Sequence, residues 1–181
     1  MGTVKTLLTF EEFEQLPDQP GKQDLVRGEL VELPPPDYKH SDISRRIFKR
    51  IDAALDEAHA SGEAAELGTV FPETGYLLHG DTWLQPDVSV THAGQRIEKY
   101  LIGAPAIVIE VISPSNTAER IAVKTELYLE CGALEVWCFF LKTKRVSIQV
   151  PGSVREIAAD GFITTPLLPG LMLSVKEIFG D

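Results

Sequence analysis

The sequence predicts an α/β fold in which helices flank a mixed central β-sheet, with β-hairpins added before and after it. The main indication is the segment 105–141, where an apolar strand, a helix and a second apolar strand follow one another. Such a βαβ unit places its two strands parallel in one sheet. Short alternating segments separated by turn residues lie on either side and are typical of antiparallel hairpins. The 181 residues suit a single domain over 1–181.

Cap signals and hydrophobic spacing predict the elements of the N-terminal half. Thr9 followed by Glu12 is a capping-box signature and predicts a short helix that ends before Pro17. Residues 24–33 predict one or two short strands, and apolar residues at helical spacing predict an amphipathic helix over 41–60. Further short strands are expected at 67–71, 75–79, 82–84 and 87–91.

The C-terminal half contains the predicted βαβ unit. The apolar run 105–112 predicts a strand that is covered on both faces. Asn116 with Glu119 predicts the N-terminal cap of a helix over 117–131, which Gly132 ends. The remaining expectations are strands at 135–141, 146–150 and 153–157, a turn at 142–145 and a short helix at 174–179.

Glu110 is the most informative residue, because it lies in the middle of the apolar strand Pro105–Ile112. An ionised carboxylate at a buried position costs several kcal/mol unless a cation, a metal ion or strong hydrogen bonds compensate for it. A positive group is therefore expected to face Glu110, either as a structural partner or as a working metal ion.

Asp87 is a second candidate for the same site. It opens the strand Gln85–Val90, in which period-two alternation separates Val88 and Val90 on one face from Asp87 and Ser89 on the other. A Pro-Asp step is common at turns, so by itself it more often marks a capped strand start. The assignment of Asp87 to a site therefore depends on what else lies nearby.

Lys124 is the third candidate. It lies on the same stripe of the helix 117–131 as Ile121 and Leu127, and this helix should pack back across the Glu110 strand. Two carboxylates and a lysine suit a hard divalent cation such as Mg²⁺, beside which the lysine can orient water or neutralise charge on a phosphate. A buried ion-pair network without catalysis fits these residues about as well, and an inward lysine can also extend outward along its stem.

Short motifs follow one another along the chain: Gly28–Val31, Pro86-Asp87, Glu110–Ser115, Lys124 with Tyr128 and Gly132, Glu135–Trp137, and Leu168–Gly170. In this order the sequence resembles the Uma-type family of putative restriction endonucleases, which belongs to the PD-(D/E)xK nuclease superfamily. The resemblance covers nearly the whole chain, from about Thr9 to Phe179. Its most specific part is the Glu-Val-Ile-Ser-Pro-Ser stretch with the downstream lysine and Glu-Val-Trp, whereas Pro-Asp alone is weak.

The resemblance implies a restriction-endonuclease-like fold, an Mg²⁺ or Mn²⁺ cofactor, and hydrolysis of phosphodiester bonds in nucleic acid, with DNA as the expected substrate. Asp87 and Glu110 would hold the metal, with the backbone carbonyl of Val111 as a further ligand. The lysine of the superfamily normally lies two residues after the acid, where this chain has Ile112. The resemblance implies that Lys124, on the following helix, takes its place.

Glu29 and His40 are weaker candidates. The resemblance makes Glu29 an accessory acid near the metal, and an exposed strand glutamate is the other explanation. Glu32 lies on the opposite strand face and is less favoured. His40 precedes the long helix, where its imidazole could donate to a phosphate, although a lone histidine there is more often a cap or exposed.

Few residues are available for nucleic-acid contacts, since the net charge is −10 and non-specific binding normally needs a basic surface. Arg45, Arg46, Lys49 and Arg50 share one face of the predicted helix 41–60. Such a run is usually a solvated face, but it is the best candidate for contacts to backbone phosphates. Bound divalent cations change the local charge, so the acidity does not exclude a metal-dependent nuclease.

Composition limits the other classes. No apolar run approaches the ~18–20 residues that span a bilayer, and the N-terminus lacks the features of a signal peptide. Two cysteines without metal-ligand spacing favour a reducing cytoplasm. Nucleophile-elbow, phosphate-loop and dinucleotide motifs are absent from the sequence. Apolar segments such as Leu167–Leu173 and exposed sheet edges favour a homodimer.

Two other functions stay open. A non-catalytic binding or assembly module would keep the fold and use the charged cluster as a structural network. A metal-dependent hydrolase of smaller phosphate esters would use the same residues on another substrate. Stabilisation by magnesium in a melting experiment separates the enzymes from the module, and a panel of substrates separates the two enzymes.

Overall fold

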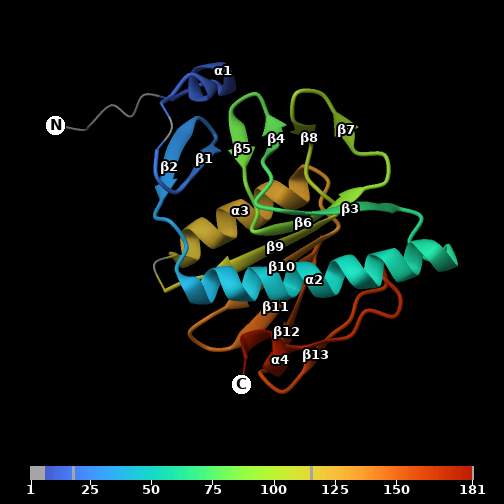
Figure 1. The fold of residues 1–181 in the computed structure, drawn as a ribbon. Coiled ribbons are helices and arrows are strands. Elements are labelled where there is room, and N and C mark those ends of the chain that lie inside the picture. The colour runs from blue at the N-terminus through green and yellow to red at the C-terminus, as the bar shows by residue number, and fades with distance from the viewer. Residues whose placement is uncertain (1–6, 18, 115, 181) are drawn as a thin grey trace.

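The computed structural model of the protein contains a central six-stranded sheet and an outer six-stranded sheet (Figure 1). The structure describes residues 7–17, 19–114 and 116–180, so Ser115 of the Glu110–Ser115 motif lies outside the described residues. The strands of the central sheet are, in spatial order, β12 (Ser153–Ile157), β11 (Arg145–Val150), β10 (Glu135–Phe140), β9 (Ile107–Ile112), β6 (Val88–His92) and β3 (Leu67–Pro72).

The predicted α/β class with a mixed central sheet is confirmed. Strands β9 and β10 are parallel, as expected for a βαβ unit, and α3 (Ala118–Glu130) connects them. The other neighbours in this sheet are antiparallel. All six residues of β9 are buried, because both faces of the central sheet are covered.

The outer sheet consists, in spatial order, of β2 (Glu29–Leu33), β1 (Lys22–Val26), β5 (Thr82–Leu84), β4 (Tyr76–His79), β8 (Leu101–Ile102) and β7 (Arg96–Ile97). A separate two-stranded sheet pairs β13 (Phe162–Ile163) with β14 (Leu173–Ser174). Strands β7, β8, β13 and β14 were not predicted, because they have two residues each and are too short to show a period.

Two apolar clusters cover the faces of the central sheet. On one face α2 (Tyr38–Ser61) contacts β3, β6 and β9 through a stripe of buried isoleucines and Leu55. On the other face α3 and the outer sheet form the second cluster. The short helix α1 (Phe10–Glu14) has the predicted capping box, and α4 (Val175–Phe179) lies against α2. Within the part of the chain that the structure describes, each helix is too short or too polar to cross a membrane.

Two predicted helix starts need correction. The N-cap of α2 is Asp37, so His40 lies in the first turn of the helix and does not precede it. The N-cap of α3 is Thr117 and not Asn116. The Asn116 side chain instead accepts hydrogen bonds from the backbone N–H and the hydroxyl of Ser113.

Candidate functional site

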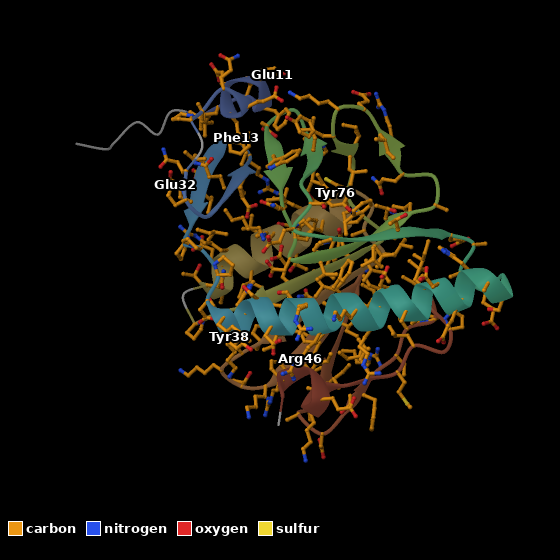
Figure 2. The ribbon with its side chains drawn as sticks, viewed as in Figure 1. Glu11, Phe13, Glu32, Tyr38, Arg46 and Tyr76 are labelled. Atoms are coloured by element: carbon orange, nitrogen blue, oxygen red, sulfur yellow. The ribbon has the colours of Figure 1, made fainter. Side chains whose placement is uncertain are left out.

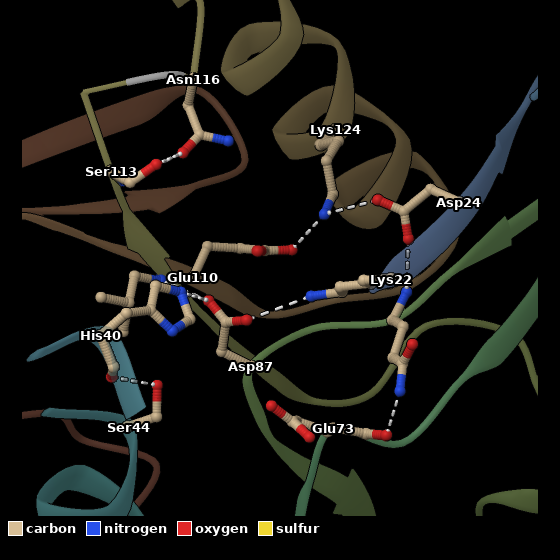
Figure 3. Close-up of polar contacts among 12 residues, drawn as sticks. Lys22, Asp24, His40, Ser44, Glu73, Asp87, Glu110, Ser113, Asn116 and Lys124 are labelled. Atoms are coloured by element: carbon tan, nitrogen blue, oxygen red, sulfur yellow. Dashed lines mark hydrogen bonds and ion pairs between the residues drawn. The ribbon is translucent and has the colours of Figure 1, made fainter. Parts of the chain in front are cut away.

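A cavity of about 1140 Å³ is lined by the C-terminal end of β9, the β1–β2 hairpin, α3 and the first turn of α2. Asp87, Glu110 and Lys124 all line it. The structure therefore brings the three main candidates together in one open cavity, although they come from a loop, a strand and a helix. Figure 3 shows their contacts.

The Glu110 half of the site is formed by β9 and α3. Neighbouring Ile109 and Val111 belong to the cluster under α2, so alternation along β9 directs Glu110 to the opposite face, where α3 packs. The Lys124 ammonium lies 2.7 Å from Oε1 of Glu110. The hydroxyl of Tyr128, one helical turn further on, donates to the same oxygen at 3.1 Å.

Asp24 of β1 completes this half and was missed by the sequence analysis. Its Oδ2 lies 3.1 Å from the Lys124 ammonium, and its Oδ1 accepts from the backbone N–H of Gln85 at 3.1 Å. Burial opposes the charge of Lys124, but Asp24 and Glu110 outweigh it and raise the pKa of this lysine. Burial and the charge of Glu110 raise the pKa of Tyr128 well above its usual value. Lys124 is therefore a fixed cation and Tyr128 a fixed donor.

The Asp87 half is formed by residues from three elements. Asp87 directly precedes β6, and its Oδ2 accepts from the backbone N–H of Val111 in β9 at 2.7 Å. Nε2 of His40, in α2, lies 3.3 Å from the same oxygen. The ammonium of Lys22, at the start of β1, lies 3.1 Å from Oδ1. Asp87 is only 5% exposed, so these contacts replace most of its hydration.

The charges of this half stabilise one another. Burial raises the pKa of Asp87, but Lys22 and His40 outweigh it, so the net shift is downward. Burial likewise opposes the charges of Lys22 and His40, and Asp87 overcomes it and raises the pKa of each. Strongly shifted titratable groups that line a cavity are typical of functional sites, although structural networks also produce them.

The donor set fits a hard divalent cation such as Mg²⁺. Such ions take oxygen ligands, and Mg²⁺ commonly uses one or two carboxylates and keeps several waters. Glu110 supplies a carboxylate from β9, and Asp87 supplies one from the loop residue that directly precedes the adjacent strand β6. Among the described residues no group of three or more His, Cys, Asp and Glu is arranged to hold a metal ion. A metal ion would therefore have few protein ligands at this site. Both carboxylates are already in contact with lysine or histidine side chains of the protein.

Some of the other predicted site residues lie away from the cavity. Glu29 lines the cavity. Figure 2 labels Arg46 on α2. Arg45 and Arg46 form ion pairs with Asp42, and Arg46 also donates to the backbone carbonyl of Glu177 on α4. Arg46 is therefore largely used within the fold. Arg45 and Lys49 are exposed on the outer face of α2, and none of these three lines the cavity.

Lys22 and Asp24 are the functional candidates that sequence reasoning overlooked. They lie two positions apart, so they share one face of β1. Two charges on the same face of a short strand could have been noticed. Their partners could not have been predicted, because Lys22 contacts Asp87, which lies 65 residues away in the sequence.

The mixed central sheet and its βαβ unit form the α/β architecture that the sequence predicted for a restriction-endonuclease-like fold. Residues 10–176 match the model of the Uma2 family, which is described as "Putative restriction endonuclease", and the chain belongs to this family. The fold is similar to a crystal structure of a putative nuclease belonging to DUF820 from Anabaena variabilis, with a TM-score of 0.80 and 23% sequence identity. The similarity covers 95% of this chain and 97% of that one. No curated protein gives a significant match.

Proposed function

We propose that the protein is an Mg²⁺-dependent endonuclease that hydrolyses phosphodiester bonds in nucleic acid, with DNA as its substrate and Mn²⁺ as an alternative metal. Membership of the family supports a nuclease function. The proposed metal dependence and the proposed site residues are supported by one observation, which is that Asp87, Glu110 and Lys124 line a single cavity. We further infer that residues 1–181 act as one domain.

In this proposal each residue has a distinct role. Asp87 and Glu110 hold the metal, together with the backbone carbonyl of Val111. The bound metal would polarise the phosphate and make water at the site more acidic. Lys124 remains protonated and stabilises the negative charge that develops on the phosphate oxygens. Tyr128 and Asp24 hold Glu110 and Lys124 in place. Glu29, on the cavity wall, is an accessory acid.

The test is nicking of supercoiled plasmid by purified protein with Mg²⁺ and with EDTA. We expect EDTA to abolish nicking, and Glu110→Gln and Lys124→Ala to slow it by about 100-fold or more, the usual effect of removing a group that stabilises the transition state. Lys142→Ala is the matched control, because Lys142 is exposed in the β10–β11 turn. Equal nicking by all four proteins would show a contaminating nuclease or another site.

A non-catalytic module is the second candidate. It is favoured by the net charge of −10 and by the internal pairing of the cluster, in which Asp24, Asp87 and Glu110 all have cationic partners. This candidate predicts that Mg²⁺ leaves the melting temperature unchanged. The nuclease predicts an increase that Asp87→Asn removes, since a ligand that binds only the folded state stabilises it.

A further inference from the structure

We propose that Lys22 is a displaceable counter-ion of Asp87, which competes with the divalent cation for this carboxylate and thereby weakens metal binding. The inference rests on the proposed function, because it assigns Asp87 to the metal. It concerns a residue of β1 that lies outside the motifs of the sequence analysis, and it predicts that a substitution can improve the metal site.

The two lysines of the cavity are held in different ways. The Lys124 ammonium lies between two carboxylates, at 3.1 Å from Asp24 and 2.7 Å from Glu110. If Glu110 turned to a metal, Asp24 would still hold Lys124. Asp87 is the only residue found within ion-pair distance of the Lys22 ammonium among the described residues, at 3.1 Å. Lys22 therefore has no second carboxylate in direct contact that would hold it when Asp87 binds a metal.

An ammonium group and a metal ion use the same lone pairs of a carboxylate, and their charges repel each other. Binding of a cation at Oδ1 of Asp87 therefore requires Lys22 to move away. The side chain can do so, because it has a flexible four-carbon stem, begins at the first residue of β1 and is 16% exposed at the cavity. Removal of Lys22 eliminates both the competitor and the repulsion.

The decisive measurement is isothermal titration calorimetry of metal-free protein with MnCl₂ and MgCl₂. We expect Lys22→Gln to bind each metal about ten-fold more tightly or better than the unmodified protein. Lys142→Gln, which removes an equal charge from an exposed turn, should bind as the unmodified protein does. Lys22→Arg keeps a cation that pairs well with a carboxylate, so it should bind no more tightly. Equal or weaker binding by Lys22→Gln overturns the inference.

The unmodified protein provides a second measurement that does not depend on how a variant folds. Lysine side-chain ¹⁵N NMR follows the ammonium groups of Lys22 and Lys124 during titration with diamagnetic Mg²⁺. We expect the Lys22 ammonium signal to shift, or to disappear because its protons exchange faster with water, while the Lys124 signal persists. An unperturbed Lys22 signal at saturating Mg²⁺ overturns the inference.

The failure of this inference differs from failure of the proposed function. If the unmodified protein and Lys22→Gln bind metal equally, the inference is wrong and the metal-dependent nuclease stands. If neither binds metal and nicking persists in EDTA, the metal-dependent function is wrong and the inference falls with it. If only Lys22→Gln binds metal at the concentrations tested, the competition is stronger than expected and the inference is supported.

Discussion

Glu110 and Asp87 lie at adjacent strands of one sheet, yet they are held differently. Glu110 is held by Lys124 and Tyr128, which both belong to α3. Lys124 also forms an ion pair with Asp24, which is only 1% exposed. Asp87 is held by Lys22, His40 and Val111, which come from β1, α2 and β9. We infer that the Glu110 half is a rigid unit and that the Asp87 half is the part of the site that can exchange partners.

The largest effect is expected from Asp24→Ala in the rigid half. The change removes a carboxylate that is only 1% exposed, leaves Lys124 with one carboxylate and removes the acceptor of the Gln85 backbone N–H. Loss of one partner of a buried ion pair costs about 3–5 kcal/mol in the free energy of unfolding. Urea denaturation in EDTA measures this free energy of unfolding. The Asp24→Asn variant can still accept the hydrogen bond from the Gln85 backbone N–H, so it should lose less stability. A loss below about 1 kcal/mol for Asp24→Ala would show that this half is not rigid.

A smaller loss of stability is expected from Asp87→Asn. Lys22 loses its carboxylate, but its side chain begins at the first residue of β1 and can turn toward solvent at the cavity, and an asparagine oxygen can still accept from Val111. We expect a loss of about 1.5–3 kcal/mol in EDTA, the usual contribution of hydrogen bonds to charged groups. A loss as large as that of Asp24→Ala would mean that both halves are equally fixed, and the contrast between them would be wrong.

The pH dependence of stability should report on His40 in the exchangeable half. Burial opposes its charge, but the hydrogen bond and charge of Asp87 raise its pKa above the usual value of about 6.5. A histidine with a higher pKa in the folded state stabilises that state while it is protonated. This stabilisation is fully present below about pH 6.5 and is lost as the pH rises through the raised pKa.

The check is the melting temperature of metal-free protein compared with His40→Gln over the range from about pH 6 to about pH 9. The advantage of the unmodified protein should shrink as the pH rises. An advantage that stays constant or grows over this range would contradict the charged contact between His40 and Asp87.

The smallest effect is expected from Tyr128→Phe. It removes one hydrogen bond to Glu110 and keeps the Lys124 ion pair, so the loss of stability should be about 0.5–1.5 kcal/mol. Nicking should slow by less than about ten-fold, which corresponds to ~1.4 kcal/mol. Tyr76→Phe is the matched control, because it removes a buried hydroxyl that contacts Ser89. Its stability should fall similarly without a change in nicking, and equal slowing by both variants would argue against a role of Tyr128 at the site.

Much of the fold could be predicted because it depends on local patterns. The apolar run around Glu110, the stripe of α2 and the strand–helix–strand order are short-range signals, and they correctly indicated the mixed sheet with its parallel pair. The contact between Glu110 and Lys124 was also accessible, since α3 follows β9 directly and must pack against it. The N-caps of α2 and α3 could not be predicted from the sequence, because several polar residues at the start of each helix compete for the same backbone groups.

The sequence by itself determined that Glu110 had to have partners, because a carboxylate inside an apolar strand needs a positive group beside it wherever the chain folds. Only the tertiary structure decided which partners these are. Lys22 and Asp24 reach the cavity because the β1–β2 hairpin is part of the outer sheet, which packs over the face of the central sheet that carries Glu110. Pairing between distant strands depends on how whole sheets pack together, and no local spacing of residues encodes it.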